Sequence, residues 1–170
     1  MSAHRPQTAQ SAPKPTFEHR SVIPTTMQAM IAFHEDPAAF SKLSPPPIFA
    51  QVHRRDWRSM ADAEVEFTLW FAVLPIRWIA RHEPGPTPTS FIDRQVKGPV
   101  ESWVHEHIFT QVAGGIELHD RLTIVHRKSG FWAIFTRLFF GTLPLRFLFI
   151  YRHLRTRMGV KRYEQTPANA

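Results

Sequence analysis

The sequence predicts an α+β fold in which a curved antiparallel β-sheet grips a long C-terminal helix. Apolar and polar residues alternate over several consecutive segments, as they do in half-buried strands. Two short helical segments with capping residues follow the first of these. After Gly130, apolar residues recur at roughly helical spacing. Strands in succession with flanking helices are typical of a sheet that has one face covered by helix.

The first elements are a strand and two short helices. We expect the strand over Thr16–Ile23. Pro24-Thr25-Thr26 ends it and offers an N-cap for a helix through Phe33. Asp36-Pro37 places a proline at the first helical position of a second helix, which ends near Leu43.

Further strands complete the sheet. Leu74-Pro75 predicts a break between two of them, and Glu83–Pro88 predicts a loop. In the clearest alternating segment, Val65, Phe67 and Leu69 fall on the buried side. The expected strands are Ile48–Arg54, Glu64–Leu69, Ile76–His82, Thr89–Lys97, Trp103–Ala113 and Ile116–His126.

The last segment should form the long helix, with a kink or break between Gly141 and Pro144 because proline disrupts a continuous helix. Its apolar residues at helical spacing are Trp132, Phe135, Leu138, Phe139, Phe147, Ile150, Tyr151 and Leu154. Phe131–Tyr151 is the one candidate membrane span, but Arg137 and Arg146 lie inside it. We therefore do not expect it to cross a bilayer.

Composition indicates one domain with short tails. The chain has 170 residues, of which 43% are hydrophobic and 21% charged, so it can bury a core. Its 14 Phe and 5 Trp are numerous enough to line a cavity as well. We expect a disordered arm over residues 1–15, the domain over 16–158 and a polar tail over 159–170. The N-terminus shows no signal peptide, so a cytoplasmic location is expected.

The absence of cysteine excludes disulfides, thiolate metal sites and thiol catalysis. The formal net charge of +7 favours anionic partners. No recognised nucleic-acid motif accompanies the C-terminal cations, so they form either a solvated helix end or a weak, salt-sensitive contact with an anionic membrane. These cations are Arg152, Arg155, Arg157, Lys161 and Arg162.

A tight hairpin at Gly114-Gly115 is the most informative local pattern. With these two glycines as the loop, Phe109 lies opposite Asp120 and His107 opposite Leu122. The concave face of the hairpin then carries Trp103, His105, His107, Phe109, Gln111, Leu118, Asp120, Leu122, Ile124 and His126. A three-residue connection through Gly98-Pro99-Val100 would also place Asp93 opposite His105, although the register of the Lys97–Trp103 connection stays open.

Buried polar groups must be paired, so this face allows several interpretations. The histidines and carboxylates form a satisfied structural network, recognise the polar end of a ligand, or act as an acid–base pair. The catalytic candidates are His105, His107, Asp93 and Asp120. His105-x-His107 also has a chelating spacing, but Gln111 and Val112 stand where such sites need a Glu, so no metal is expected.

Several segments resemble the START-type, helix-grip superfamily (SRPBCC), and in particular its bacterial polyketide cyclase/dehydrase-like branch. The resemblance spans Thr16–Met158 and departs from the family at His126–Gly130, the entrance to the last helix. The matching segments are Phe17–Ser21, Leu43–Pro45, Phe91–Gln95 with Gly98-Pro99, Trp103–Phe109 and Leu118–Arg121.

This resemblance implies a ligand-binding domain with a hydrophobic cavity between the sheet and the last helix. We therefore expect the protein to bind a small, largely apolar ligand of lipid, polyketide or aromatic type, without a cofactor. The alternatives are a cyclase or dehydratase that uses a His–Asp pair in the cavity, and an interaction protein whose filled cavity is only a core. The expected ligand contacts are Phe67, Trp78, Asp93, Gln95, Trp103, His105, His107, Phe109, Asp120 and Leu122.

Overall fold

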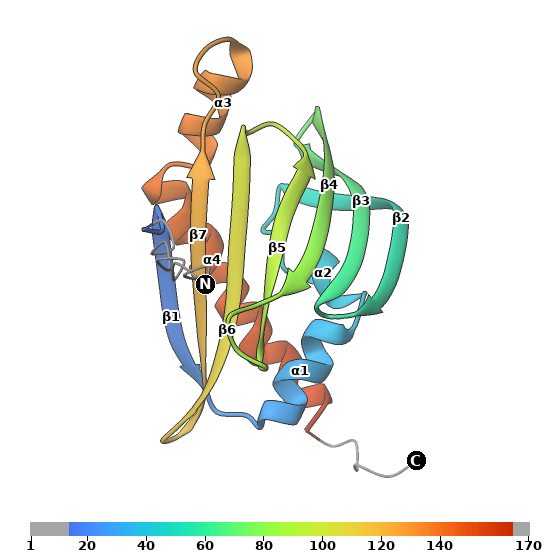
Figure 1. The fold of residues 1–170 in the computed structure, drawn as a ribbon, viewed down its shortest axis with the longest axis vertical. Coiled ribbons are helices and arrows are strands. Elements are labelled where there is room, and N and C mark those ends of the chain that lie inside the picture. The colour runs from blue at the N-terminus through green and yellow to red at the C-terminus, as the bar shows by residue number, and fades with distance from the viewer. Residues whose placement is uncertain (1–13, 165–170) are drawn as a thin grey trace, which may run out of the picture.

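The computed structural model describes residues 14–164, so most of the predicted N-terminal arm and the end of the predicted tail lie outside the described residues. A seven-stranded antiparallel sheet in the order β1-β7-β6-β5-β4-β3-β2 curves around the C-terminal helix α4, as Figure 1 shows. The predicted fold class is confirmed. The strands are β1 (Phe17–Ile23), β2 (Ile48–Ser59), β3 (Asp62–Phe71), β4 (Leu74–Pro84), β5 (Ser90–Lys97), β6 (Ser102–Val112) and β7 (Gly115–Val125).

The predicted break at Leu74-Pro75 is wrong. Leu74 opens β4 and pairs with Phe71, while Pro75 pairs with Trp70. The turn lies two residues earlier, at Ala72-Val73, where Ala72 has φ 54°. A proline near the start of a strand removes one donor from the ladder but does not prevent pairing at a hairpin end.

The register of the β6–β7 hairpin differs from the prediction by two residues. Val112 pairs with Gly115, so the loop is Ala113-Gly114, and His107 lies opposite Asp120 rather than Leu122. A shift by two residues keeps every side chain on its predicted face, because side chains alternate with a period of two along a strand. Asp93 pairs with His105, as the three-residue connection requires.

Two short helices follow β1, as predicted. The hydroxyl of Thr26 caps α1 (Met27–Glu35) by accepting a hydrogen bond from the Ala29 backbone N–H. The second helix, α2 (Ala39–Lys42), is only one turn long. Asp36 turns the chain before α2 by accepting a hydrogen bond from the Ala38 backbone N–H.

The C-terminal segment is broken near the predicted position. The first piece, α3 (Phe131–Phe139), ends before Gly141, and α4 (Thr142–Gly159) starts directly after it with Pro144 in its first turn, where no intrahelical donor is lost. Within residues 14–164, no single helix is long and apolar enough to cross a bilayer. The pair formed by α3 and Thr142–Arg162 passes by length and composition alone, bent by 53°.

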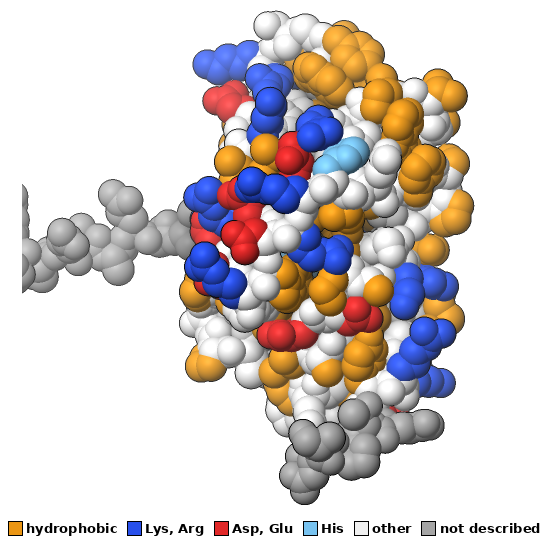
Figure 2. All heavy atoms as spheres, turned by 90° about the vertical axis from the view of Figure 1, so that its right-hand side faces the viewer, with side chains coloured by type: hydrophobic (Ala, Val, Ile, Leu, Met, Phe, Trp, Pro, Cys, Tyr) orange, Lys and Arg blue, Asp and Glu red, His pale blue; other side chains and the backbone are white. Residues whose placement is uncertain are grey.

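Only part of the apolar stripe read from the sequence of the last segment faces the sheet, where Phe135 is buried against Phe71 of β3. Its members Leu138, Phe147 and Leu154 are exposed. The face of α4 that packs against the sheet instead carries Leu145, Phe149, His153 and Thr156. Figure 2 shows hydrophobic side chains at the top and along the right-hand margin of the molecule, with a group of Lys and Arg side chains lower on the same margin.

The chain stays packed beyond residue 158. A single 3₁₀ turn, η1 (Val160–Arg162), follows α4, and Val160 is 1% exposed. The Tyr163 hydroxyl donates a hydrogen bond to Asp36 at 2.5 Å. Residues 159–163, assigned to the polar tail from sequence, therefore fasten the end of the last helix to the region of α1.

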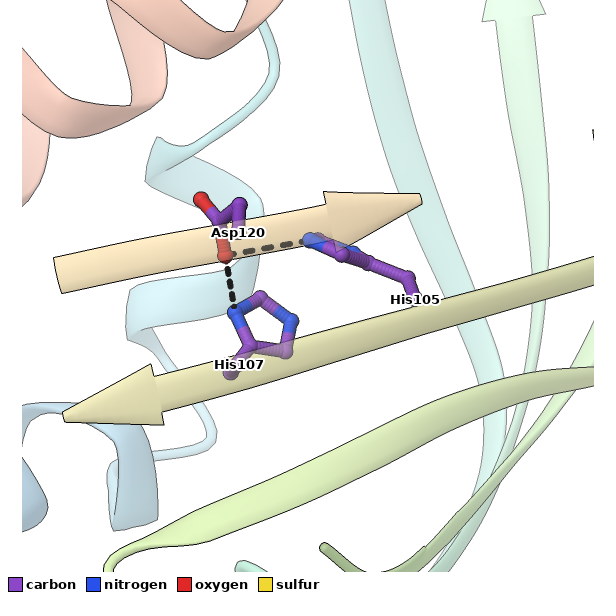
Figure 3. Close-up of side chains that lie close together, drawn as sticks. All are labelled: His105, His107 and Asp120. Carbon is purple, nitrogen blue, oxygen red and sulfur yellow. Dashed lines mark hydrogen bonds and ion pairs between the residues drawn. The ribbon is translucent and has the colours of Figure 1, made fainter. Parts of the chain in front are cut away.

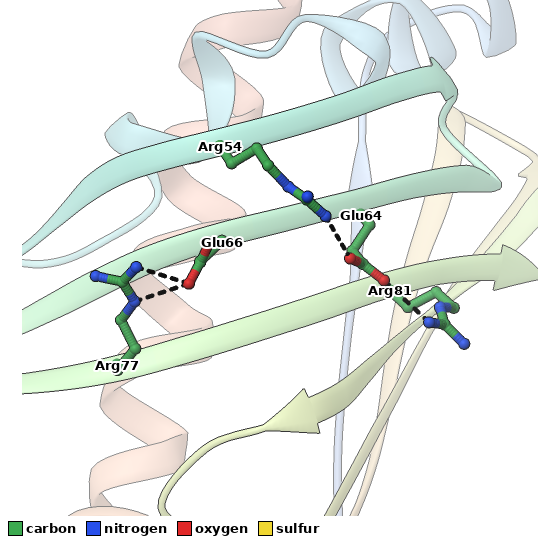
Figure 4. A network of polar contacts seen from close by, with 5 residues as sticks. All are labelled: Arg54, Glu64, Glu66, Arg77 and Arg81. Carbon is green, nitrogen blue, oxygen red and sulfur yellow. Dashed lines mark hydrogen bonds and ion pairs between the residues drawn. The ribbon is translucent and has the colours of Figure 1, made fainter.

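The outer face of the sheet carries charge pairs. Glu64 on β3 binds Arg54 of β2 at 2.9 Å and Arg81 of β4 at 3.0 Å, while Glu66 binds Arg77 at 2.6 Å (Figure 4). Exposed pairs of this kind each contribute about 0–1 kcal/mol. Their main consequence is to place the polar side of β2–β4 outward, so that the other side faces the helices.

Candidate functional site

Two adjoining cavities lie between the concave face of the sheet and the helices. The large cavity has a volume of about 310 Å³, at the low end of the roughly 300–1,000 Å³ that small-molecule sites occupy. The small cavity measures about 60 Å³. Both are lined by Phe40, Leu43, Phe67, Asp93 and Arg152.

The wall of the large cavity is mostly aromatic and aliphatic. Trp78 packs edge-on against Trp103, with ring centroids 5.3 Å apart, and both rings lie against Phe140 at the α3–α4 break. The same wall includes residues from β3, from the segment after α2, and from α4. These are Ser44, Pro45, Ile48, Leu69, Phe71, Phe139, Pro144, Phe147 and Leu148.

Besides the hydroxyl of Ser44, three polar groups interrupt this wall: Asp93, Trp103 and Arg152. Asp93 Oδ1 and Trp103 Nε1 are buried and have no hydrogen-bond partner among residues 14–164. A buried polar atom without a partner is destabilising by about 1–3 kcal/mol. Asp93 offers an acceptor, Trp103 a donor and Arg152 a positive charge, so the cavity can satisfy both sides of a hydroxyl or carbonyl group.

Asp120 is the centre of a buried histidine cluster behind the small cavity. His105 Nε2 lies 3.1 Å and His107 Nδ1 2.7 Å from Oδ1, and His153 Nε2 of α4 lies 2.8 Å from Oδ2. Figure 3 shows both β6 imidazoles turned toward the carboxylate on β7. All four side chains are at most 6% exposed. Four polar groups from two strands and the last helix therefore fill one buried space.

The protonation of this cluster follows from its contacts. His153 donates through Nε2 to Asp120, and its Nδ1 forms a hydrogen bond with the Ser21 hydroxyl at 2.6 Å. His107 Nδ1 approaches Asp120 closely but at an angle poor for a hydrogen bond, which leaves this nitrogen without a well-aligned partner. A lone pair facing a carboxylate oxygen at that distance would repel it, so Nδ1 carries the proton and Nε2 is the nitrogen available to a ligand.

Burial is the main cause of the lowered pKa values of the two histidines on β6. It lowers the pKa of His107 to about 3, with His105 adding to the effect, and it lowers the pKa of His105 as well. For Asp120, burial alone would favour the neutral acid, but the neighbouring His107 and His105 outweigh it and hold the pKa well below its usual value. His105 and His107 are therefore neutral imidazoles beside an ionised Asp120.

His34 of α1 extends the polar side of the small cavity. Its Nδ1 donates to the Met30 carbonyl at 2.8 Å, and its ring centroid lies 6.0 Å from that of His107. Both rings line the small cavity, as does His82, whose Nδ1 donates to the Met60 carbonyl at 3.0 Å. Burial lowers the pKa of His34 to about 3, so this ring also offers a neutral acceptor nitrogen.

His105, His107 and Asp120 also have the makings of a metal site, since their candidate ligand atoms lie within 4.8 Å of one another. However, the three donor–acceptor contacts of Asp120 are 2.7–3.1 Å long, which is hydrogen-bond spacing, and the nitrogens that face Asp120 carry protons. An ion at this place would require those protons to leave. The expectation of no metal therefore stays a prediction.

The residues expected to contact a ligand divide into two groups. Phe67, Trp78, Asp93, Trp103 and His107 line one or both cavities. The others lie elsewhere. His105 and Asp120 are buried in the cluster, Phe109 and Leu122 are core residues, and Gln95 donates to the Val100 carbonyl in the β5–β6 connection.

Sequence reasoning placed the last helix at the cavity but did not identify Arg152 or His153 as residues of this region. Arg152 was assigned to the basic end of the helix, yet it lines both cavities. His153 was not singled out, although Leu145, Phe149 and His153 recur at four-residue intervals and form the buried face. That spacing was a usable signal, but the more hydrophobic stripe on the opposite face concealed it.

Comparison with solved structures places the domain among proteins of the helix-grip fold. The Zhui aromatase/cyclase from Streptomyces sp. R1128 aligns with a TM-score of 0.65 and 12% identity over 91% of this chain and 98% of its own. The KanY protein aligns with a TM-score of 0.63 and 14% identity, over 85% of this chain and 95% of KanY. The di-domain aromatase/cyclase StfQ of the steffimycin pathway aligns with a TM-score of 0.59 and 10% sequence identity. The alignment covers 88% of this chain and 52% of StfQ.

No protein-family model matches the sequence, and no curated protein matches it. At these identities the similarity to solved structures shows the fold alone.

Proposed function

We propose that the protein binds a small, largely apolar molecule with one polar end in the large cavity between the sheet and α4. The observation that carries this proposal is the pair of buried, unpartnered polar atoms, Asp93 Oδ1 and Trp103 Nε1, in a mostly apolar wall. A structural core would pair or avoid such atoms. A ligand hydroxyl can donate to Asp93 and accept from Trp103, which removes both deficits.

The two kinds of wall have different roles in this proposal. Apolar surface contributes about 25 cal/mol per Å² buried and does not orient the ligand. Asp93, Trp103 and Arg152 fix its orientation and disfavour molecules that leave these groups unpaired. Helix-grip neighbours that are aromatase/cyclases support a polyketide-like or aromatic ligand as one class within the proposal.

A cavity-filling substitution tests the proposal directly. Leu148 lines the large cavity from α4, so Leu148→Trp should occupy the space of the ligand. Leu154→Trp is the matched control, because Leu154 lies on the same helix, is 53% exposed and does not line either cavity. Binding of an environment-sensitive apolar dye should fall at least tenfold in the first variant and stay unchanged in the control.

Equal dye affinity in both variants and in the parent, with both variants folded, would refute the proposal. Native mass spectrometry of the purified protein then identifies the bound class through any small molecule that co-purifies. That molecule should be absent from Leu148→Trp.

Catalysis is the second candidate, and His107 is the reason for it. His107 lines the small cavity and is held by Asp120, which is the base-and-orienter arrangement of acid–base enzymes. A cyclase or dehydratase would use the free Nε2 as its base. A pKa of about 3 makes this nitrogen a weak base near neutral pH, so binding without reaction is the favoured proposal.

A further inference from the structure

The outward face of α3 and α4 is apolar along its whole length. On α4 the exposed residues follow one another at intervals of three or four positions, which places them on a single side of the helix. On α3 the same spacing links Phe131, Ile134 and Leu138. We call this set the α3–α4 face, and it comprises Phe131, Ile134, Leu138, Phe139, Leu143, Phe147, Ile150, Leu154 and Met158.

Single exposed hydrophobic residues are ordinary, but a continuous run of this length is not. Leu143 is 67%, Phe147 72% and Ile134 73% exposed, so most of each side chain faces solvent. Hydrophobic side chains occupy the corresponding margin of the surface in Figure 2. A stripe of this kind marks a surface that is covered when the protein works.

The charges around the α3–α4 face are all of one sign. Residues 131–163 contain seven Lys and Arg and no Asp or Glu, and the formal net charge of the whole chain is also +7. Arg137, Arg146 and Arg157 are exposed and lie one position before Leu138, Phe147 and Met158. Cations therefore flank the apolar stripe on both α3 and α4.

This combination selects among the possible partners. A second copy of the chain would bring a second set of cations against the first, and like charges across an interface are unfavourable. An anionic bilayer offers both complements at once, because its acyl region accepts apolar side chains and its headgroups attract cations. Lys and Arg beside an apolar helix face are typical of helices that lie in the membrane interface.

We propose that the α3–α4 face docks on an anionic phospholipid bilayer, with its apolar side chains in the interface and its arginines at the headgroups. The docking itself does not depend on the proposed ligand. The large cavity opens toward this face, because Phe139 and Phe147 line the cavity and are also 40% and 72% exposed. If the proposed binding function holds, a bilayer at this face allows an apolar ligand to enter the cavity without crossing water.

The test is co-sedimentation of the full chain with vesicles. Vesicles of phosphatidylcholine with 30% phosphatidylserine should bind the protein, and pure phosphatidylcholine vesicles should bind it at least tenfold more weakly. The triple variant Ile134→Ser/Ile150→Ser/Leu154→Ser removes apolar contacts outside both cavities and should reduce binding at least tenfold. Val73→Ser is the matched control, since Val73 is 90% exposed in the β3–β4 turn.

Charge and insertion are separated by two further measurements. Each of Arg146→Gln and Arg157→Gln should weaken binding roughly fivefold, as expected for one cation near an anionic surface. Part of the binding should persist in 1 M salt, because apolar insertion is not screened. Apolar-dye binding in the absence of vesicles should be unchanged in the triple variant, so failure of docking is distinguishable from failure of ligand binding.

Three outcomes would overturn the docking proposal. The first is no sedimentation with either vesicle, and the second is equal binding of the parent and the triple variant, with circular dichroism showing that the variant is folded. The third is a concentration-dependent dimer in light scattering that the triple variant abolishes, because this result would assign the face to self-association instead.

Discussion

Asp120 on β7 lies directly opposite His107 on β6, and the two side chains meet at 2.7 Å from Oδ1 to Nδ1. His105 reaches the same oxygen from the next position on that face of β6, at 3.1 Å. The two histidines differ in one respect that matters: His107 lines the small cavity and His105 does not. They therefore form a matched pair for separating ligand contact from support of the fold.

The first prediction uses this pair. His107→Ala and His105→Ala each remove one donor from Asp120, so both should lower the free energy of unfolding by about 1–3 kcal/mol. Only His107→Ala should also weaken binding of an apolar dye whose polar end reaches from the large cavity into the adjoining small cavity. Denaturant unfolding and dye titration on the same samples measure the two effects. Unchanged dye affinity in a destabilised His107→Ala would leave His107 with a structural role only.

The second prediction concerns the carboxylate itself. Asp120→Asn replaces an acceptor of three donors by a group with one acceptor and two donors of its own. Losing the charge at the centre of a buried network should lower the free energy of unfolding by about 3–5 kcal/mol. Glu66→Gln on the outer face, paired with Arg77 in Figure 4, is the control and should change it by less than about 1 kcal/mol. Similar losses in both variants would contradict the buried network.

The third prediction is a dependence of stability on pH. The pKa of His107 is about 3 in the folded protein and 6.5 in the reference state, so between these values only the unfolded chain binds the proton. Stability is therefore complete above about pH 6.5 and falls as the pH is lowered. His34 acts in the same direction over the same window. Each histidine contributes a slope of up to about 1.4 kcal/mol per pH unit.

Urea unfolding at pH 7, 6, 5 and 4 measures this slope. His107→Gln should reduce the slope by the contribution of one proton, up to about 1.4 kcal/mol per pH unit, because glutamine does not titrate. If the free energy of unfolding of the parent does not change between pH 7 and pH 4, these histidines keep ordinary pKa values in the folded protein.

The fourth prediction is that replacing Asp93 affects ligand binding but does not lower the stability of the ligand-free protein. Its Oδ1 is buried without a partner in the described residues, so Asp93→Leu should leave the stability of the ligand-free protein unchanged or raise it by about 1 kcal/mol. The same change should weaken the binding of dyes that carry a hydroxyl and leave the binding of purely hydrocarbon probes unchanged. A large loss of stability would instead identify Asp93 as a structural residue.

The fifth prediction concerns metal. Asp120 already accepts N–H groups from His105 and His153, so an ion at this place would have to displace those protons. Protein purified without a His-tag should contain no stoichiometric zinc, iron or manganese, and EDTA should leave its melting temperature unchanged. A fall of several degrees in the melting temperature on chelation would identify His105, His107 and Asp120 as metal ligands.

Periodicity decided which residues share a face, and this was available from sequence. The hairpin register was wrong by two residues, yet His105, His107 and Asp120 were still placed together on the concave side. Alternation along a strand survives a shift of two, since it depends on local backbone geometry alone. The same local rules located the α3–α4 break, because Gly141 and Pro144 act on their own segment.

The contribution of the last helix was decided only by the tertiary structure. An apolar stripe at helical spacing states that one side of a helix avoids water, but not whether protein or another surface covers it. On α4 the protein covers Phe149 and His153 and leaves Phe147 and Leu154 outside. Arg152 reaches the cavities and His153 reaches Asp120 because 32 residues of intervening chain fold back onto the sheet, which no local pattern encodes.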